Sequence, residues 1–171
     1  MSLQRYLASL GHFTTGVDVG TKAIELARRK SVEQGLSSRA EFLAYDALQL
    51  PEPLTPVDFI YDNTVYCNLR LQYLEKVRAM LQRVTTPGHT LYMLNCGNAQ
   101  DAALIGGHPR LRLQAIKDDL GDLFDFEKVY EGVYDMDLSG PISRHANEWH
   151  LENSGVRSWT MLLRRKKEVT P

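Results

Sequence analysis

One stretch, FTTGVDVGTKAIELARR at residues 13–29, constrains the fold of this chain more than any other. A β-branched, apolar run surrounds Asp18, Gly20 and Thr21 supply a turn and a helix cap, and a helix-forming run follows. A strand that ends in an acid and turns at once into a helix is typical of open α/β sheets that bind nucleotides, where the carboxylate accepts hydrogen bonds from ribose hydroxyls. Asp18 could equally serve only as a helix cap, so this stretch alone leaves both interpretations open.

Composition restricts the class of protein. The chain has 171 residues, 43% hydrophobic and 24% charged, with a net charge of −1, which fits one ordinary globular domain over residues 1–171. The charge favours neither nucleic acid nor an anionic membrane as partner, and the basic cluster at 164–167 is expected to be a solvated chain end. No apolar run approaches the roughly 20 residues of a membrane span. Two isolated cysteines favour a reduced, cytoplasmic setting over a disulfide scaffold.

Apolar periodicity predicts alternating strands and helices. The predicted strands cover residues 14–19, 40–45, 57–61, 90–94, 126–138 and 156–163. The predicted helices cover residues 3–10, 21–34, 70–84 and 113–124, and residues 95–109 and 140–155 are predicted loops. This order indicates a Rossmann-like α/β fold, a mostly parallel twisted sheet with helices on both faces. The last two strands lack a helix between them, so we expect the C-terminal strand to be antiparallel and interior to the sheet.

Three consecutive predicted strands end in an acid, namely Asp18, Asp46 and Asp62. The carboxyl ends of parallel strands line one edge of a sheet, and ligands bind in the crevice outside that edge. Three carboxylates suit a ligand rich in hydroxyl and amino donors, whereas a bare triphosphate would be repelled and no GxxxxGK[ST] loop offsets that. The five histidines are scattered at spacings that do not suit a metal, so no metal site is predicted.

Several segments together resemble class I S-adenosylmethionine-dependent methyltransferases. The segments resembling that family's second to fifth strands and its closing antiparallel strand are, in order, LASLGHFTTGVDVGTKAIELARRKSVEQGL, AEFLAYDALQLP, VDFIYDNTVYCNL, YLEKVRAMLQRVTTPGHTLYML and SWTMLLRRKK. The loop GNAQ…GGHPR and the closing SWTMLLRR are most similar to the branch with thiopurine and tellurite-resistance methyltransferases. The resemblance covers nearly the whole chain.

The resemblance implies a role for each strand-end residue. Asp18 would hold the ribose hydroxyls of S-adenosylmethionine with Val19 near the adenine, and Asp46 would accept the adenine amino group beside Ala47. Asp62 and Asn63 would stand near the methionine end of the cofactor. The residues implied to contact a small-molecule methyl acceptor are Tyr66, Trp149 and His150. No catalytic nucleophile is predicted, because methyl transfer from a sulfonium is a direct displacement that needs positioning and exclusion of water.

One family motif has no counterpart in the sequence. The glycine-rich GxGxG loop should come just before LASLGHF, where the chain begins, and no other segment replaces it. Only glycine lets the backbone approach the methionine part of the cofactor so closely. We therefore expect a domain N-terminally truncated relative to the family, without its first strand and with weak or absent cofactor binding. The strands ending in Asp18 and Asp62 would then pair directly, or a second copy in a homodimer would fill the gap.

Three functions remain open on the sequence alone. The first is a small-molecule methyltransferase that uses S-adenosylmethionine. The second is a non-catalytic methyltransferase-fold module for binding or assembly, which the missing glycine loop favours. The third is an NAD-dependent oxidoreductase, because an acid after the second strand also suits the ribose of NAD. The acid after the third strand and the closing antiparallel strand favour the first two.

Overall fold

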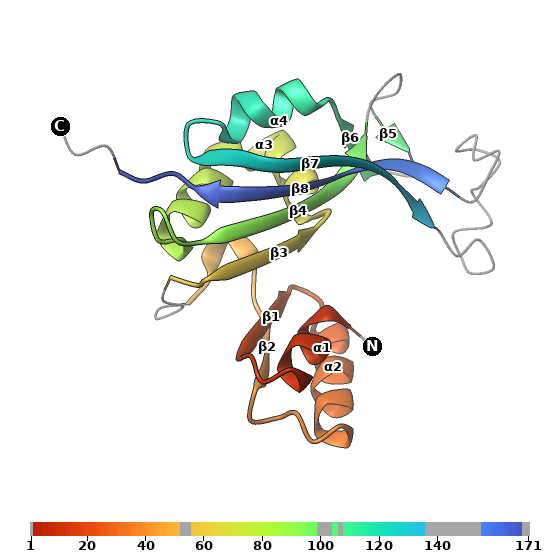
Figure 1. The fold of residues 1–171 in the computed structure, drawn as a ribbon. Coiled ribbons are helices and arrows are strands. Elements are labelled where there is room, and N and C mark those ends of the chain that lie inside the picture. The colour runs from red at the N-terminus through yellow and green to blue at the C-terminus, as the bar shows by residue number, and fades with distance from the viewer. Residues whose placement is uncertain (1, 52–55, 99–103, 106–107, 136–154, 169–171) are drawn as a thin grey trace. The chain divides into compact units, whose positions relative to one another are not determined.

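The computed structural model describes residues 2–51, 56–98, 104–105, 108–135 and 155–168. The chain divides into two compact units, Met1–Pro53 and Leu54–Pro171 (Figure 1). The predicted single domain over 1–171 stays a prediction, as does direct pairing between the strands that end in Asp18 and Asp62. Within the described residues no helix is both long enough and apolar enough to cross a membrane.

The first unit contains a parallel pair of strands packed against helices. Its elements are α1 (Leu3–Ser9), β1 (Thr14–Asp18), α2 (Thr21–Glu33), β2 (Ala40–Ala44) and the 3-10 helix η1 (Ala47–Gln49). The register sets Asp18 opposite Ala44, so both strands end at the same edge. The core is made by Ala8, Ile24, Ala40 and Phe42. A Cβ added at Gly16 would lie 2.9 Å from the Phe42 ring, so this strand position requires glycine unless the ring moves.

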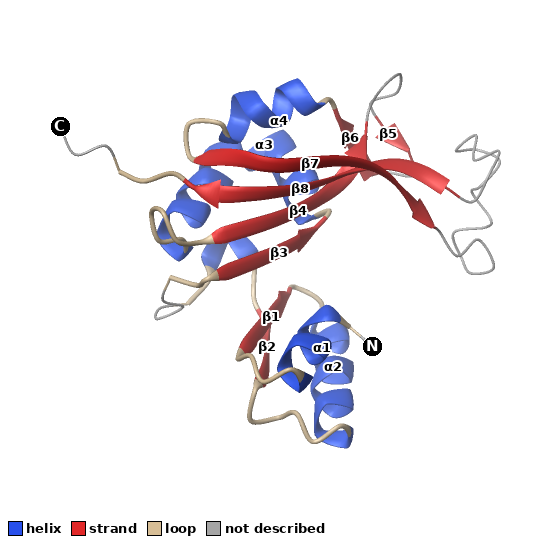
Figure 2. Cartoon of the chain, viewed as in Figure 1, coloured by secondary structure: helices blue, strands red, loops and turns tan. Residues whose placement is uncertain are grey.

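The second unit is built on a six-stranded mixed sheet. Its elements are β3 (Phe59–Asn63), α3 (Val65–Val84), β4 (Leu91–Asn98), β5 (Leu104–Ile105), β6 (His108–Leu111), α4 (Leu113–Leu120), β7 (Phe124–Asp135) and β8 (Gly155–Arg165). The strand order is β5-β6-β4-β8-β7, and β3 also pairs with β4. The β3–β4 and β4–β6 pairs are parallel, whereas β8 runs antiparallel to both β4 and β7. The helices α3 and α4 flank this sheet (Figure 2).

The predicted fold class is confirmed: a mixed sheet with flanking helices and an antiparallel C-terminal strand, as in Rossmann-like methyltransferases. The interior place of β8 is also confirmed, since it pairs with a strand on each side. Its Trp159 is buried and donates a 2.9 Å hydrogen bond from Nε1 to the carbonyl of Leu111.

Several element boundaries were predicted wrongly. The helix predicted over 113–124 ends at Leu120, and Phe124 already belongs to β7. The stretch 95–109 is not a continuous loop, because β4 continues to Asn98 and β5 and β6 follow. The helix α3 begins at Val65 and not near residue 70. Its early start has a local cause: the Asp62 carboxylate accepts hydrogen bonds from the backbone N–H groups of Val65 (2.8 Å) and Tyr66 (3.0 Å), which satisfies the first turn.

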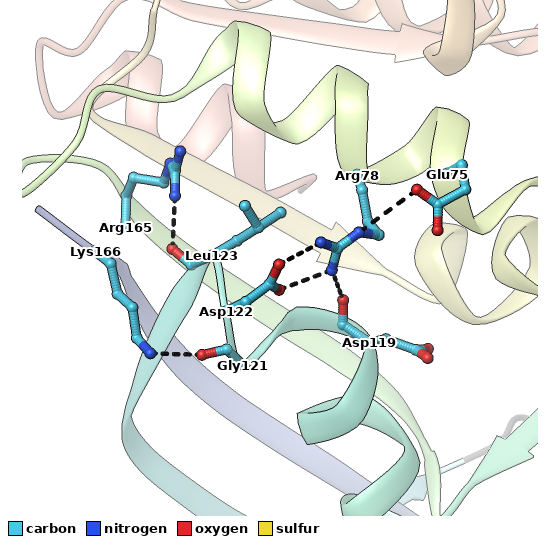
Figure 3. A network of polar contacts seen from close by, with 8 residues as sticks. All are labelled: Glu75, Arg78, Asp119, Gly121, Asp122, Leu123, Arg165 and Lys166. Carbon is cyan, nitrogen blue, oxygen red and sulfur yellow. Dashed lines mark hydrogen bonds and ion pairs between the residues drawn. The ribbon is translucent and has the colours of Figure 1, made fainter. Parts of the chain in front are cut away.

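The basic cluster at the C-terminus is not a solvated tail. Arg164 and Arg165 belong to β8 and are half-buried. Arg164 forms an ion pair with Glu127 on the neighbouring β7. Arg165 donates to the carbonyl of Leu123, and the Lys166 ammonium donates to the carbonyl of Gly121 at 2.6 Å (Figure 3). These cations therefore secure the connection between α4 and β7.

Candidate functional site

The candidate site lies at the edge of the first unit where β1 and β2 end. Asp18 is the last residue of β1, and its Oδ1 accepts a 2.7 Å hydrogen bond from the backbone N–H of Gly20. Asp46 follows β2, and its Oδ1 accepts a 2.9 Å hydrogen bond from the backbone N–H of Leu48, which caps η1. The carbonyl of Asp18 also accepts the N–H of Tyr45 at 3.1 Å, so the two acids stand on neighbouring chain segments.

These two acids have the same local geometry. In each, one carboxylate oxygen is fixed by the backbone N–H two residues further along, as in an Asx turn. Asp18 is exposed and Asp46 half-buried. Apolar surface lies beside them, since Val19 is 73% and Tyr45 is 45% exposed, and the half-buried Ala47 comes directly after Asp46.

The donor and acceptor pattern of this edge fits an adenosine. An exposed, oriented carboxylate accepts hydrogen bonds from two vicinal ribose hydroxyls, a second carboxylate accepts from an exocyclic amino group, and exposed apolar side chains suit the face of a purine. The structure places Asp18 and Asp46 at one edge of a parallel strand pair, as predicted. Their contacts with a cofactor, and those of Val19 and Ala47, stay predictions.

Asp62, in the second unit, has a different environment. It is 9% exposed at the carboxyl end of β3, and besides the two N–H groups of α3 it accepts a 2.9 Å hydrogen bond from the Tyr92 hydroxyl. Burial raises the pKa of the Asp62 carboxyl, and the hydrogen bonds from Tyr92, Val65 and Tyr66 partly offset that rise. The described contacts therefore make Asp62 the cap of α3. A contact between Asp62 and a cofactor stays a prediction.

The residues after Asp62 differ in exposure. Asn63 is exposed, and Thr64 has a left-handed backbone with φ of 71°. Tyr66 is 1% exposed, and its hydroxyl donates to the Asp119 carboxylate on α4, which also pairs with Arg70. Contact of Asn63 with the cofactor and of Tyr66 with a substrate stay predictions. Trp149 and His150, the other predicted substrate residues, lie outside the described residues.

Sequence reasoning missed Asp119, Arg70 and Tyr92. Asp119 and Tyr92 are 8% and 1% exposed, and Arg70 is half-buried. Arg70 stands four residues after Tyr66, the spacing that brings two side chains to one face of a helix. No pattern in the sequence connects either residue with Asp119, because that contact joins α3 to α4.

Neither a metal cluster nor a reactive thiol is found in the described part of the chain. No group of three or more histidine, cysteine or acidic side chains there could hold a metal ion. Cys67 and Cys96 are both free and buried. Burial raises the pKa of the Cys67 thiol to about 11 and raises the pKa of Cys96 still further, so neither is a nucleophile near neutral pH.

Comparison with known proteins identifies the family. A family model described as a methyltransferase domain matches residues 2–88, just over half of the chain. The chain therefore belongs to this methyltransferase family, and the predicted resemblance to class I methyltransferases is confirmed.

Solved structures agree with this fold. A SAM-dependent methyltransferase from Methanosarcina mazei is 16% identical with a TM-score of 0.72, covering 95% of this chain and 86% of its own. TehB from Haemophilus influenzae is 18% identical with a TM-score of 0.68, over 94% of this chain and 52% of its own. A TehB-like SAM-dependent methyltransferase from Corynebacterium glutamicum is 15% identical with a TM-score of 0.62, over 96% of this chain and 74% of its own. At these identities the likeness concerns the fold.

Proposed function

We propose that this protein is an S-adenosylmethionine-dependent methyltransferase of a small molecule, and that the first unit binds the adenosine part of the cofactor where β1 and β2 end. One observation carries the proposal: Asp18 and Asp46 stand at the same edge of a parallel strand pair, each with Oδ1 held by a backbone N–H. An oriented carboxylate loses little freedom when it accepts a ligand hydroxyl, so binding there costs less conformational entropy.

Each residue has a distinct role in this proposal. Asp18 accepts the ribose hydroxyls, Val19 presents its exposed side chain to the purine, Asp46 accepts the amino group, and Ala47 lies beside it. When bound, S-adenosylmethionine supplies a methyl group on a sulfonium, which reacts by direct displacement. The protein therefore positions the reactants and excludes water, and needs no covalent nucleophile.

Calorimetric titration tests the proposal. We expect saturable binding of S-adenosylmethionine and S-adenosylhomocysteine and no binding of NAD. The Asp18→Asn change should weaken cofactor binding about tenfold or more, since it removes a charged hydrogen-bond acceptor. Glu25→Gln, which neutralises an exposed carboxylate on α2, is the matched control and should leave the affinity unchanged. Binding of NAD alone would favour the oxidoreductase, and equal affinity of the Asp18 variant would refute the proposed site.

A non-catalytic binding module is the second candidate. It would keep the methyltransferase fold and the strand-end acids Asp18 and Asp46 for binding or assembly, without transferring a methyl group. The two candidates differ in turnover. Transfer of a labelled methyl group from S-adenosylmethionine to a small-molecule extract supports the enzyme, whereas binding without transfer supports the module.

The proposal includes a homodimer of this chain. A second copy would supply hydrogen-bond partners for exposed strand edges. Sedimentation velocity at several protein concentrations tests this: a concentration-dependent dimer supports the homodimer, and a monomer at all concentrations refutes it.

A further inference from the structure

The helix α3 is interrupted. Tyr73 has φ of −134° and ψ of 30°, outside the helical range, so two helical parts meet there. We call residues 65–72 the front segment and residues 74–84 the rear segment. Thr64, directly before the front segment, has φ of 71° and is the only non-glycine residue with positive φ among those described. The front segment is therefore bounded on each side by a residue with non-helical backbone.

Thr64 is held in this conformation although it is β-branched, a residue type that disfavours it. Its N–H donates to the carbonyl of Asn95 on β4 at 2.9 Å. Its carbonyl accepts a hydrogen bond from the Cys67 thiol at 3.1 Å and one from the Asn68 side chain at 2.6 Å. The strained residue thus lies between the sheet and the first turn of the front segment.

The two segments are anchored to α4 and to the turn after it through different atoms. The front segment contacts the Asp119 carboxylate, which accepts from the Tyr66 hydroxyl and pairs with Arg70. The rear segment contacts the carbonyl of Asp119 and the carboxylate of Asp122, both through Arg78. Figure 3 shows the Asp119 carboxylate turned away from Arg78. A change in that carboxylate therefore affects the front segment and leaves the contacts of Arg78 in place.

The front segment is too short to remain helical by itself. Isolated helices need about 12 to 15 residues to be even marginally stable in water. Within the front segment only Tyr66 and Cys67 are fully buried, whereas Val65 and Leu71 are 44% and 59% exposed. Its helical state therefore depends on docking, through the Asp62 cap and the Asp119 carboxylate.

We propose that residues 65–72 are a hinged segment that docks and undocks as a unit about Thr64 and Tyr73, with the Asp119 carboxylate as its latch. The rear segment and the sheet keep their contacts in the undocked state. Asn63 and Thr64 join β3 to the front segment. Undocking of the front segment therefore changes the positions of these two residues at the carboxyl end of β3. This proposal does not depend on cofactor binding.

Amide hydrogen exchange tests the latch in the Asp119→Asn variant of the full chain. We expect the amides of Tyr66 and of residues 69–72 to exchange about tenfold faster, the effect of weakening one charge-assisted hydrogen bond. The amides of residues 78–84 and of β4 should keep their rates, because Arg78 bonds to a carbonyl and to Asp122. The matched control is Asp118→Asn, the same change at an exposed neighbour on α4 whose carboxylate accepts a hydrogen bond from the Gln114 side chain.

Thiol labelling provides a second readout. Cys67 is buried in the front segment, so its labelling in a Cys96→Ala background reports undocking. Asp119→Asn should speed labelling of Cys67 about tenfold, while Asp118→Asn should not. Cys96 lies in β4, and its labelling in a Cys67→Ala background should not change with Asp119→Asn.

Two results of the exchange experiment would overturn the proposal. Equal acceleration of the front segment, the rear segment and β4 would mean that Asp119→Asn opens the whole unit. Unchanged exchange in residues 65–72 would mean that the carboxylate is no latch. If Asp119→Asn does not fold, Arg70→Gln removes the other half of the ion pair, and the same selective acceleration is required of it.

Discussion

The hydroxyl of Tyr92 on β4 donates a 2.9 Å hydrogen bond to Oδ2 of Asp62 at the end of the neighbouring β3. Both residues are buried, and the same carboxylate also accepts two backbone N–H groups from the first turn of α3. This single carboxylate therefore connects the sheet to the helix that follows β3. A buried acid is tolerated there because its oxygens have donors from the sheet and from the helix.

Tyr92→Phe should lower the free energy of unfolding by about 1 to 2 kcal/mol, because a buried acceptor loses one of its donors. It should also raise the pKa of Asp62 further, since the lost hydrogen bond stabilises the ionised carboxylate. Urea denaturation measures the first effect. Tyr130→Phe, at a position 56% exposed on β7, is the control and should change stability by less than about 0.5 kcal/mol. Equal effects of the two variants would contradict a specific role of the Tyr92 hydroxyl.

The raised pKa of Asp62 predicts a pH dependence of stability. The folded state holds this proton more tightly than the unfolded state, whose carboxyl has the ordinary value of 3.8. The contribution of Asp62 to the free energy of unfolding is therefore fully present below pH 3.8 and is lost as the pH rises through the higher folded pKa. Asp62→Asn cannot titrate, so the difference between the wild-type and variant stability curves should change across that window.

The pH dependence due to Asp62 can be distinguished from that due to an acid whose pKa is lowered. The Arg78 guanidinium lowers the pKa of Asp122, so the contribution of Asp122 is lost below pH 3.8, as the pH falls through its folded pKa. The two windows lie on opposite sides of that value. A difference curve for Asp62→Asn that is flat above pH 3.8 would show that burial does not raise the pKa of Asp62.

The two thiols should react slowly in the folded protein. Burial raises the pKa of Cys67 to about 11, so at pH 8 about one thiol in a thousand is ionised. Cys96 is fully buried in β4 with a higher pKa still. We expect labelling by a disulfide reagent to be at least about 100-fold slower than in denaturant for both thiols. Fast labelling of Cys96 in the native protein would contradict its burial.

The backbone at Thr64 predicts an unusual preference for glycine. Thr64→Gly and Thr64→Ala both remove the branched side chain, but only glycine adopts φ of 71° without strain. We expect Thr64→Gly to be more stable than Thr64→Ala by about 1 kcal/mol, even though glycine gives the unfolded chain more freedom. Denaturant titration of the two variants measures the difference. Greater stability of the alanine variant would show that Thr64 is not held in the left-handed conformation.

Much of the fold could be predicted because its determinants are local. Strand β1 was predicted within one residue from the β-branched run before Asp18, and α2 from the turn at Gly20 and the helix-forming run after it. The antiparallel pairing of β7 and β8 was predicted because the sequence between them shows no helical periodicity, and the pairing is confirmed. The end of β4 was not predictable in this way, because it is set by its pairing with β6 and β8.

Among the candidate site residues, too, those with local determinants could be placed from the sequence and those with distant partners could not. Asp18 and Asp46 could be placed at one edge because each follows a strand, and parallel strands end together. The environment of Asp62 could not be predicted, because its partner Tyr92 lies on another strand, 30 residues away in the sequence. The contacts of Asp119 with Tyr66 and Arg70 could not be predicted either, because they join residues 53 and 49 positions apart in the sequence.

The sequence by itself determined the alternation of strands and helices, the acids at the strand ends and the family. Those features depend on neighbours within a few residues, where side-chain periodicity and turn chemistry act. Only the tertiary structure decided which of the acids is exposed and which is a buried cap, and which partners Arg70 and Arg78 find on α4 and in the turn after it. Burial and hydrogen-bond partners are properties of segments brought together by folding. Two residues of one type, such as Asp18 and Asp62, therefore differ in exposure, and burial raises the pKa of Asp62.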